Sequence, residues 1–542
     1  MTTTASGTAG PASSRIGIVR EIAGGTSVCR FDVAALRALA DQSDPTARTA
    51  GQVGSQIKIR VGNGWLLGNV RTLKASEHDD GHVTAHADFL GEGIEGADGS
   101  LSDFRRGVTR YPMPGDAVHP VSRADLKQIF EAVDQPHIEI GTVYPTADIR
   151  ASLLYDAMLG RHFALLGSTG TGKSTATALI LHRIVAQAPH GHVVMLDPHG
   201  EYAAAFAASG VIFNVDNLAL PYWLMNFEEH CEVFITTEGA ERELDRDILA
   251  KCLLAARGRS RIAQSLGKLT VDSPVPYLLS DLLAAIGGQM GKLDKAGELA
   301  PYMRLKTKIE ELKSDPRYGF MFNGLLVSDT MAAFLGKILR LPTDGKPISI
   351  IDLSGVPSDI VTVVVAVLSR LVFDYAIWSR HEPRRPILLV CEEAHRYVPS
   401  DRVATGGAVR KMIERIAKEG RKYGVSLGLI TQRPSDLAEG VLSQCGTIIA
   451  MRLNNERDQA YVRDAMPEGA RGFLDSIPAL RNRECIICGE GVPIPIRVRL
   501  DELAPQLRPA SDDPLFSRLW TDSGGEAEIL ERTIHRWRGQ GR

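Results

Sequence analysis

The pattern of apolar and polar positions changes near residue 138. Over residues 15–130, short stretches such as 16–19, 56–60 and 82–86 alternate or carry β-branched residues, and clusters of Gly, Asp and Asn separate them. Alternation with a period of two is typical of half-buried strands, and closely spaced short strands form small barrels or sandwiches. The pattern therefore predicts a small all-β domain over residues 15–130.

Beyond residue 138, apolar runs alternate with helical spacings. The runs expected to be strands are residues 163–166, 192–197, 348–352, 385–391, 426–432 and 447–452. They are apolar throughout, as strands buried on both faces are, and helical patterns lie between them. We expect an α/β fold whose core, with a mainly parallel sheet, covers residues 138–217 and 346–500.

Three segments depart from this alternation. Residues 218–345 contain charged helical stretches and are predicted to form an inserted helical subdomain. Residues 501–542 form a polar, Pro-containing C-terminal extension that ends in a helix near 527–537. Residues 1–14 are rich in Thr, Ala, Gly and Ser and lack the basic-then-apolar order of a signal peptide, so they are predicted to be a disordered tail.

The most apolar helical stretch, residues 360–378, is interrupted by Arg370 and Asp374. Its uncharged part falls short of the ~18 residues of a spanning helix, so we expect a buried core helix and no membrane association. The seven cysteines form an odd, scattered set, which is consistent with a reducing, cytoplasmic location. Cys485 and Cys488 lie in an apolar, strand-like run, which favours core packing over a zinc site.

The charge balance constrains the partners of the chain. Its 542 residues include 62 Lys and Arg against 65 Asp and Glu, a net charge of −3. A chain of this length accommodates roughly two or three domains. Because so even a balance gives no whole-chain sign of nucleic-acid binding, any such surface has to be local, for example the lining of a pore.

Candidate chemistry begins at residues 167–174, which read Gly-Ser-Thr-Gly-Thr-Gly-Lys-Ser and form a complete G-x-x-x-x-G-K-[ST] loop. A strand-like run precedes the loop and helical spacing follows it, so a bound polyphosphate would meet a helix N-terminus. In this motif Lys173 reaches the β- and γ-phosphates, and Ser174 offers its hydroxyl to Mg²⁺. The residues expected to hold ATP are Gly167, Ser168, Thr169, Gly170, Thr171, Gly172, Lys173, Ser174 and Thr175.

Two carboxylates, Glu392 and Glu393, follow the apolar run 387–391. This is the Walker B pattern, in which the first acid orients Mg²⁺-bound water and the second polarises the attacking water. Glu392 stands where Asp is usual, and two solvated acids that open a loop are the alternative. Gln432, at the end of the next strand, has an amide that can bond the γ-phosphate and the attacking water, although Gln before a Pro-capped helix is by itself more often a structural turn.

Phosphoryl transfer also gains from an arginine that neutralises charge in the transition state, often supplied by a neighbouring subunit. The candidates are Arg421, in the basic stretch 418–422 at a predicted helix end, and Arg161, shortly before the phosphate-binding loop. The alternative is that these cations stabilise a helix C-terminus. The residues alone leave both interpretations open.

Taken in order, these residues resemble the HerA family of hexameric DNA translocases, in the wider HerA/FtsK group of P-loop ATPases. The β-domain, with Arg-Gly-Val-Thr at 106–109 and Tyr-Pro-Met-Pro-Gly-Asp at 111–116, resembles the HAS-barrel of that family. The resemblance covers roughly residues 15–520 and is specific in the combination of its motifs. The matching segments of the core are residues 167–174, 196–202, 351–355, 392–395, 420–424, 431–436 and 451–455.

The resemblance implies a RecA-like core, a homo-hexameric ring with ATP held between neighbours, and double-stranded DNA threaded through a central pore. It implies that Glu393 is the catalytic glutamate and that Gln432 senses the γ-phosphate. It also implies that Arg421 is a finger acting in trans, with Arg161 a second arginine at the subunit boundary. Asp197 would help to order the site, and a loop-opening helix cap is the alternative.

Members of the family typically act with a partner, either a NurA-type nuclease in DNA end processing or a sirtuin-type or nuclease effector in anti-phage defence, and the HAS-barrel is the expected docking surface. We therefore expect an ATP-driven, helicase-like motor on duplex DNA. A regulatory ring that scaffolds and activates an effector, and a ring that moves DNA or protein through a membrane channel, are the alternatives. The candidate DNA contacts, which are otherwise solvated surface, are Arg402, Arg410, Lys411 and residues 257–261.

Overall fold

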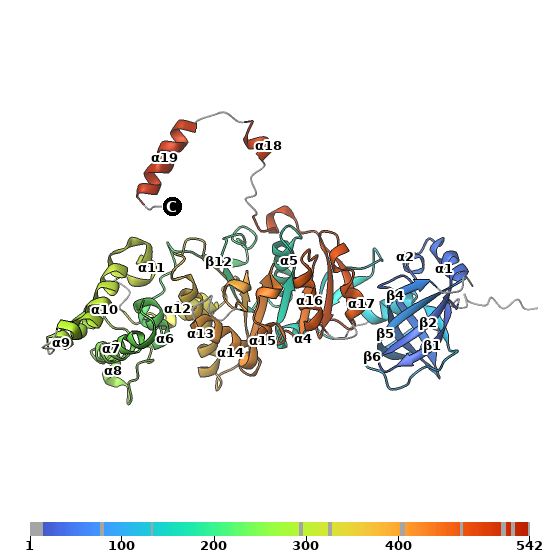
Figure 1. Ribbon diagram of the computed structural model, residues 1–542, viewed down its shortest axis with the longest axis horizontal. Helices are drawn as coiled ribbons and strands as arrows, with labels where there is room; N and C mark the ends of the chain where they lie inside the picture. The colour runs from blue at the N-terminus through green and yellow to red at the C-terminus, as the bar shows by residue number, and fades with distance from the viewer. Residues whose placement is uncertain are drawn as a thin grey trace, which may run out of the picture. The chain divides into compact units, whose positions relative to one another are not determined.

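The computed structural model describes residues 15–75, 81–131, 134–291, 296–323, 328–400, 407–466, 470–510, 516–521 and 526–539 (Figure 1). The tail predicted at residues 1–14 lies outside this part of the chain. The described residues divide into two compact units. The first contains the chain up to Pro189 together with segments that begin at Val390 and Glu414, and the second contains the stretch from His190 to Leu389 and the C-terminal segment from Pro505.

The N-terminal domain is a closed β-barrel, drawn in blue in Figure 1. Its sheet has the order β2-β1-β7-β3-β4-β5-β6, and an additional pairing of β2 with β5 closes a ring of strands with β6 outside it. The seven strands are β1 (Gly17–Ala23), β2 (Thr26–Asp32), β3 (Gln56–Val61), β4 (Gly64–Ala75), β5 (His82–Glu95), β6 (Leu101–Arg106) and β7 (Ala117–Pro120). The small all-β domain predicted from the alternating pattern is confirmed, and it is a barrel rather than a sandwich. Its interior is filled by the inward residues of these strands.

Short helices cover the barrel. Helices α1 (Val33–Ala40) and α2 (Pro45–Arg48) begin at aspartate caps, and α3 (Arg123–Phe130) begins with a capping box formed by Ser122 and Asp125. Asp125 is buried and also pairs with Lys58 of β3, with 3.0 Å between Lys58 Nζ and Asp125 Oδ2. A buried ion pair of this kind fixes where α3 docks, because neither charge can be left unpaired.

In the first unit the core is a sheet with the order β14-β15-β10-β16-β17-β18-β8-β9. Strand β10 is parallel to both β15 and β16, whereas β17, β18, β8 and β9 form an antiparallel end. The strands are β14 (Ile387–Cys391), β15 (Val425–Thr431), β10 (Phe163–Leu166), β16 (Thr447–Ala450), β17 (Glu484–Gly489), β18 (Ile496–Leu500), β8 (Ile138–Val143) and β9 (Arg150–Leu153). The α/β core with parallel strands is thus confirmed, with an antiparallel end that the apolar pattern did not indicate.

The run that carries the C-x-x-C pair is strand β17. Cys485 and Cys488 are both fully buried, and burial raises the pKa of the Cys488 thiol to about 12. Residues three apart in a strand point to opposite faces of the sheet. The two thiols therefore serve as small apolar core groups, as the sequence favoured.

The second unit contains the parallel strands β12 (Gly210–Phe213), β13 (Ile348–Asp352) and β11 (His192–Asp197). The predicted helical insertion consists mainly of α6 (Phe227–Phe234), α7 (Gly239–Gly258), α8 (Arg261–Ser265), α9 (Leu279–Met290), α10 (Ala296–Ser314), α11 (Gly319–Phe322) and α12 (Met331–Leu339). Helices α7, α9 and α10 pack against one another (Figure 1). The C-terminal segment contains α18 (Phe516–Leu519) and α19 (Glu526–Arg538), which accounts for the helix predicted near residues 527–537.

Helix α13 (Val361–Trp378) is the apolar helix of the sequence pattern. Among the described residues it is the single helix long and apolar enough to cross a membrane, with a mean hydropathy of 1.8, and 67% of it is buried inside the structure. The helix reaches this length only when the charged residues Arg370 and Asp374 are included. Its burial is typical of the core helix that we expected.

A buried ion pair links α13 to the helical insertion. Arg370 donates to both carboxylate oxygens of Glu229, at 2.8 and 2.9 Å, and to the carbonyl of Leu224 at 2.6 Å. Glu229 is 1% exposed and also completes the capping box of α6 with Asn226. Two charges buried together are tolerated only while each has its partner.

We predict that Arg370→Leu lowers the free energy of unfolding by about 3–5 kcal/mol, because it leaves the Glu229 carboxylate buried without its cation. Urea unfolding followed by circular dichroism measures this change. The matched control is Arg259→Leu, since Arg259 is 53% exposed and makes one ion pair with Asp281. That variant should change stability by less than about 1 kcal/mol. Equal effects of the two substitutions would contradict the prediction.

Candidate nucleotide-binding site

The phosphate-binding loop connects β10 to α5 (Lys173–Gln187). Gly170 and Gly172 have φ angles of 77° and 97°, which L side chains rarely adopt. At Gly167 a Cβ atom would lie 2.9 Å from the side chains of Met451 and Thr171, so only glycine is accommodated there. The chain thus turns tightly into α5, whose first N–H groups have no partner within the helix and point at the space above the loop.

Lys173 lies at the first position of α5 and is only 8% exposed. No carboxylate in the described part of the chain pairs with its ammonium group. Its ammonium group thus has no counter-ion within the described chain, and a phosphate group bound by the loop amides supplies that negative charge. The loop and Lys173 therefore have the chemistry that a polyphosphate requires. Ser174, the next residue, is half-buried on the same helical turn.

Gln432 is brought to this loop by the pairing of β10 with β15. The two strands are parallel, with Leu166 opposite Thr431, so the residues that follow them emerge side by side. Thr169 Oγ1 donates a hydrogen bond to Gln432 Oε1. The geometry therefore joins the candidate sensor to the phosphate-binding loop, as the motif order suggested.

The two carboxylates follow β14 directly, and both are buried. Glu393 has φ +50°, a left-handed conformation that is uncommon for a side chain of this kind and costs about 1–3 kcal/mol. Its Oε2 is fully enclosed, and no described residue forms a hydrogen bond of good geometry with it. The two acids are therefore buried rather than solvated, and strain with an unsatisfied buried oxygen is an arrangement that recurs at functional sites.

His395 joins these groups, although the sequence reasoning gave it no role. Its Nδ1 lies 2.9 Å from Thr431 Oγ1 and 3.2 Å from Glu393 Oε2. Burial lowers the pKa of the imidazole, against the opposing effect of the Glu393 charge. The signal in the sequence was its place two residues after Glu393, in the run Glu-Glu-Ala-His.

The two candidate arginines lie at the opposite end of the strands from the phosphate-binding loop. Arg161 precedes β10, and Arg421, in the last turn of α14 (Gly407–Tyr423), precedes β15. The phosphate-binding loop follows β10, so the length of that strand, about 13 Å for four residues, separates it from Arg161. Arg161 Nη1 instead pairs with Glu490 at 2.5 Å, and Arg421 is exposed. The structure therefore does not bring either arginine to the loop of its own chain.

His162 connects the two segments that carry these arginines. It is 3% exposed with φ +59°; its Nδ1 accepts a hydrogen bond from the N–H of Leu427, and its Nε2 lies 3.1 Å from the carbonyl oxygen of Ala417. Because Nδ1 is an acceptor, the neutral ring carries its hydrogen on Nε2 and donates it to Ala417. Burial lowers the pKa of His162, in keeping with this neutral state.

The remaining sequence candidates have other surroundings. In the second unit, Asp197 accepts hydrogen bonds from the N–H groups of His199, Gly200 and Tyr202, which supports the alternative that it caps the loop after β11. Burial raises its pKa. Arg257 is wrong as a candidate DNA contact, because it is 0% exposed and bonds backbone carbonyls of its own unit.

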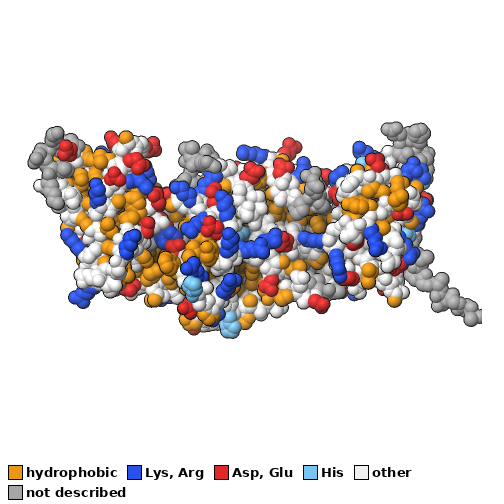
Figure 2. All heavy atoms as spheres, turned by 90° about the horizontal axis from the view of Figure 1, so that it is seen from below, with side chains coloured by type: hydrophobic (Ala, Val, Ile, Leu, Met, Phe, Trp, Pro, Cys, Tyr) orange, Lys and Arg blue, Asp and Glu red, His pale blue; other side chains and the backbone are white. Residues whose placement is uncertain are grey.

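The other single-residue candidates for DNA contacts differ in their exposure. Arg402 lies outside the described residues, Arg410 is half-buried in α14, and Lys411 is exposed. On the face shown in Figure 2, Lys and Arg side chains are interspersed with acidic ones. This mixture agrees with the even charge balance of the chain, so a DNA-binding surface has to be a local one.

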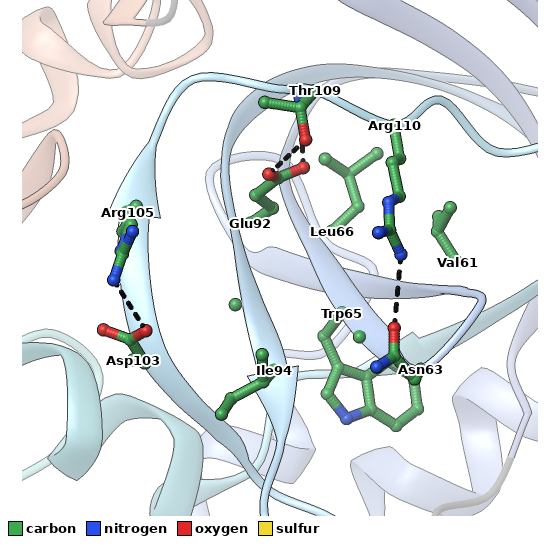
Figure 3. A pocket seen from close by; sticks show the side chains of 12 residues that line it. Val61, Asn63, Trp65, Leu66, Glu92, Ile94, Asp103, Arg105, Thr109 and Arg110 are labelled. Atoms are coloured by element: carbon green, nitrogen blue, oxygen red, sulfur yellow. Dashed lines mark hydrogen bonds and ion pairs between the residues drawn. The ribbon is translucent and has the colours of Figure 1, made fainter.

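Of two cavities in the first unit, one adjoins the phosphate-binding loop and the other lies in the barrel. A polar cavity of about 500 Å³ lies beside the phosphate-binding loop and is lined in part by Ser168, Thr169 and Gln432. A cavity of about 290 Å³ lies in the barrel, where Thr109 donates to Glu92 and Arg110 donates to Asn63 (Figure 3). The first cavity contains the candidate chemistry, and the second is lined by barrel residues and their connecting loop.

Comparison with known proteins gives the chain its relatives. Residues 138–372 match the family model of the helicase HerA central domain. The chain is 28% identical over 479 residues to the DNA double-strand break repair helicase HerA of Pyrococcus furiosus, covering 80% of this chain and 82% of that protein. It is 26% identical over 434 residues to the DNA double-strand break repair helicase HerA of Sulfolobus acidocaldarius, covering 79% and 80% of the two chains.

Solved structures include two with a similar arrangement. VirB4 of Thermoanaerobacter pseudethanolicus is 14% identical, with a TM-score of 0.49, over 69% of this chain and 99% of that one. The plasmid coupling protein TrwB in complex with ADP and Mg²⁺ is 14% identical, with a TM-score of 0.47, over 72% of this chain and 94% of that one.

We predict that acidification below pH 6.5 destabilises the protein and that His162→Gln weakens this dependence. The folded-state pKa of His162 is lowered, so the unfolded chain binds more protons below pH 6.5; stability is complete above that pH and falls as the pH drops through the window below it. One histidine contributes at most about 1.4 kcal/mol per pH unit. His192, His230 and His395 have lowered pKa values as well, so the variant should reduce the slope without abolishing it.

Urea unfolding at pH 7.5 and 5.5 measures this slope in wild type and variant. The exposed His381 provides a matched control, because His381→Gln should leave the slope as it is in wild type. An unchanged slope in His162→Gln would contradict the prediction.

Proposed function

We propose that this chain, a member of the HerA helicase family, is the subunit of a homo-hexameric motor that hydrolyses ATP with Mg²⁺ and moves along double-stranded DNA. The observation that carries the proposal is Lys173, a buried cation without a carboxylate partner at the start of α5, beside a loop whose glycines allow a polyphosphate to approach the backbone. The family membership adds DNA as the object on which the ATPase acts, because the curated relatives are DNA double-strand break repair helicases.

In this proposal each residue of the site has one role. The loop residues 167–175 hold the phosphates, and Lys173 neutralises the charge that builds up on the β- and γ-phosphates. Ser174 and Glu392 hold Mg²⁺, directly or through its water. Glu393 polarises the attacking water, and Gln432 contacts the γ-phosphate after giving up its hydrogen bond from Thr169.

The arginines complete the site from a neighbouring subunit. Arg161 and Arg421 lie at the end of the sheet opposite their own phosphate-binding loop, which supports action on the loop of another subunit. Both are exposed or half-exposed and so are available to a second copy of the chain. The arginine of one subunit then stabilises the transition state that forms on the loop of the next.

The proposal also includes a biological setting. A cytoplasmic motor of this family supplies duplex DNA to a nuclease or another effector, in DNA end processing or in anti-phage defence, and the N-terminal barrel is the surface on which the effector docks. A ring that only regulates such an effector remains the second candidate, and the response of hydrolysis to DNA separates the two.

We predict that linear duplex DNA stimulates ATP hydrolysis and that Lys173→Ala and Glu393→Gln abolish it. Loss of the glutamate should lower kcat by about 10²–10⁴-fold, the size of a general-base contribution, while ATP still binds. A coupled phosphate-release assay with and without DNA measures the rates. Lys313→Ala, on an exposed position of α10, is the matched control and should behave as wild type. Robust hydrolysis that is indifferent to DNA would favour the regulatory ring.

We also predict that mixing two inactive variants, Lys173→Ala and Arg421→Ala, restores part of the hydrolysis. Each variant alone lacks one half of every site, with an expected loss of about 10³-fold or more, but mixed rings contain interfaces in which an intact loop meets an intact arginine. Mixing Lys173→Ala with Glu393→Gln should restore nothing, because both changes affect the same half. No recovery in the first mixture would contradict action in trans.

A further inference from the structure

Two side-chain oxygens of the first unit lie close to the Nδ1 atom of His395. Thr431 Oγ1 lies 2.9 Å away at the end of β15, and Glu393 Oε2 lies 3.2 Å away after β14. Thr431 Oγ1 also accepts a hydrogen bond from the backbone N–H of Arg433 at 3.0 Å. Thr431 is 0% exposed and Glu393 is 7% exposed, so these contacts are shielded from water.

The hydrogen on the imidazole can be placed from these contacts. In one tautomer the Thr431 hydroxyl donates to Nδ1, but a lone pair on Nδ1 then faces the carboxylate oxygen of Glu393, which is repulsive. We therefore place the hydrogen on Nδ1. That single N–H then has two acceptors, the hydroxyl of Thr431 and the carboxylate of Glu393. The hydrogen bond to Thr431 has good geometry, whereas Glu393 Oε2 has no hydrogen bond of good geometry from any described residue.

The contacts extend from His395 to the phosphate-binding loop. Thr431 is followed by Gln432, and Thr169 of the loop donates to Gln432. A displacement of Gln432 moves the adjacent end of β15 and with it the hydroxyl that competes for the His395 hydrogen. The orientation of Glu393 is thereby linked to what the loop holds.

We propose that His395 is a positioning residue that shares its Nδ1 hydrogen between Thr431 and Glu393 and so couples the orientation of the Glu393 carboxylate to the strand that carries Gln432. This inference rests on the proposed function, in which Glu393 polarises the attacking water. The enclosed Oε2 supports it, because His395 is then the group that satisfies this oxygen when Thr431 moves. The strained φ of Glu393 supports it as well, because a strained residue is held by its surroundings and responds when they change.

The test uses side chains that place a donor at one or the other ring nitrogen. Asparagine puts an amide N–H where Nδ1 lies, glutamine puts one where Nε2 lies, and leucine has none. We expect His395→Asn to keep kcat within about threefold of wild type, and His395→Gln and His395→Leu to lower kcat by about tenfold or more, with the KM for ATP unchanged. A carboxylate misplaced by about 1 Å produces losses of this order.

A second pair of variants keeps the test independent of the folding of His395 variants. Thr431→Ser retains the hydroxyl and should behave as wild type, whereas Thr431→Val should lower kcat by about tenfold. Because the two residues act as one unit, the double variant His395→Leu, Thr431→Val should lose no more than either single variant.

The outcomes separate the inference from the proposed function. Equal kcat values for the Asn, Gln and Leu variants at matched melting temperatures, or equal values for the Ser and Val variants, would overturn the role of His395. Full hydrolysis in Glu393→Gln would overturn the proposed function and this inference together. Loss in Glu393→Gln, with the Asn variant active and the Gln variant impaired, supports both.

Discussion

The parallel pairing of β10 with β15 is the constraint on which the candidate site depends. Because Leu166 lies opposite Thr431, the residues that follow the two strands lie together at one end of the sheet, called here the first edge. The residues that precede the strands lie together at the opposite end, the second edge. The first edge holds the phosphate-binding loop and Gln432. The second holds Arg161 and, through the end of α14, Arg421. His162 fixes this second edge by bonding to both α14 and β15.

Two buried charged residues at the first edge have polar groups whose interactions are incomplete within the described chain. Lys173 has no anionic partner in the described chain, and Glu393 has an enclosed oxygen without a hydrogen bond and a backbone in the left-handed region. Each arrangement reduces the stability of the folded chain. The buried pair of Arg370 and Glu229 shows the contrast, because there every polar contact is made within the chain. Lys173 and Glu393 thus lie where a bound nucleotide would supply the missing partners.

The sequence predicted the structure correctly wherever a short run of residues determines the local geometry. The glycines of the loop, the apolar strands β10, β14 and β15, and the acids after β14 were all predicted, because each follows from a short run of residues. The antiparallel end formed by β17, β18, β8 and β9 was not, since alternation and apolarity describe a strand but not the direction of its neighbour. The burial of Arg257 and the contacts of His395 were also missed, because they depend on segments distant in the chain.

The position of the arginines also constrains how copies of the chain can meet. A two-fold symmetric pair places the loop of each subunit beside the arginine of the other, and then the assembly stops at two copies. A head-to-tail contact, in which the loop end of one sheet meets the arginine end of the next, gives every subunit one loop partner and one arginine partner, and it repeats. Such a repeat forms a ring when its rotation closes and an open filament when it does not. Action of Arg421 in trans therefore requires a second copy, and the proposed ring adds the requirement that the head-to-tail contact closes.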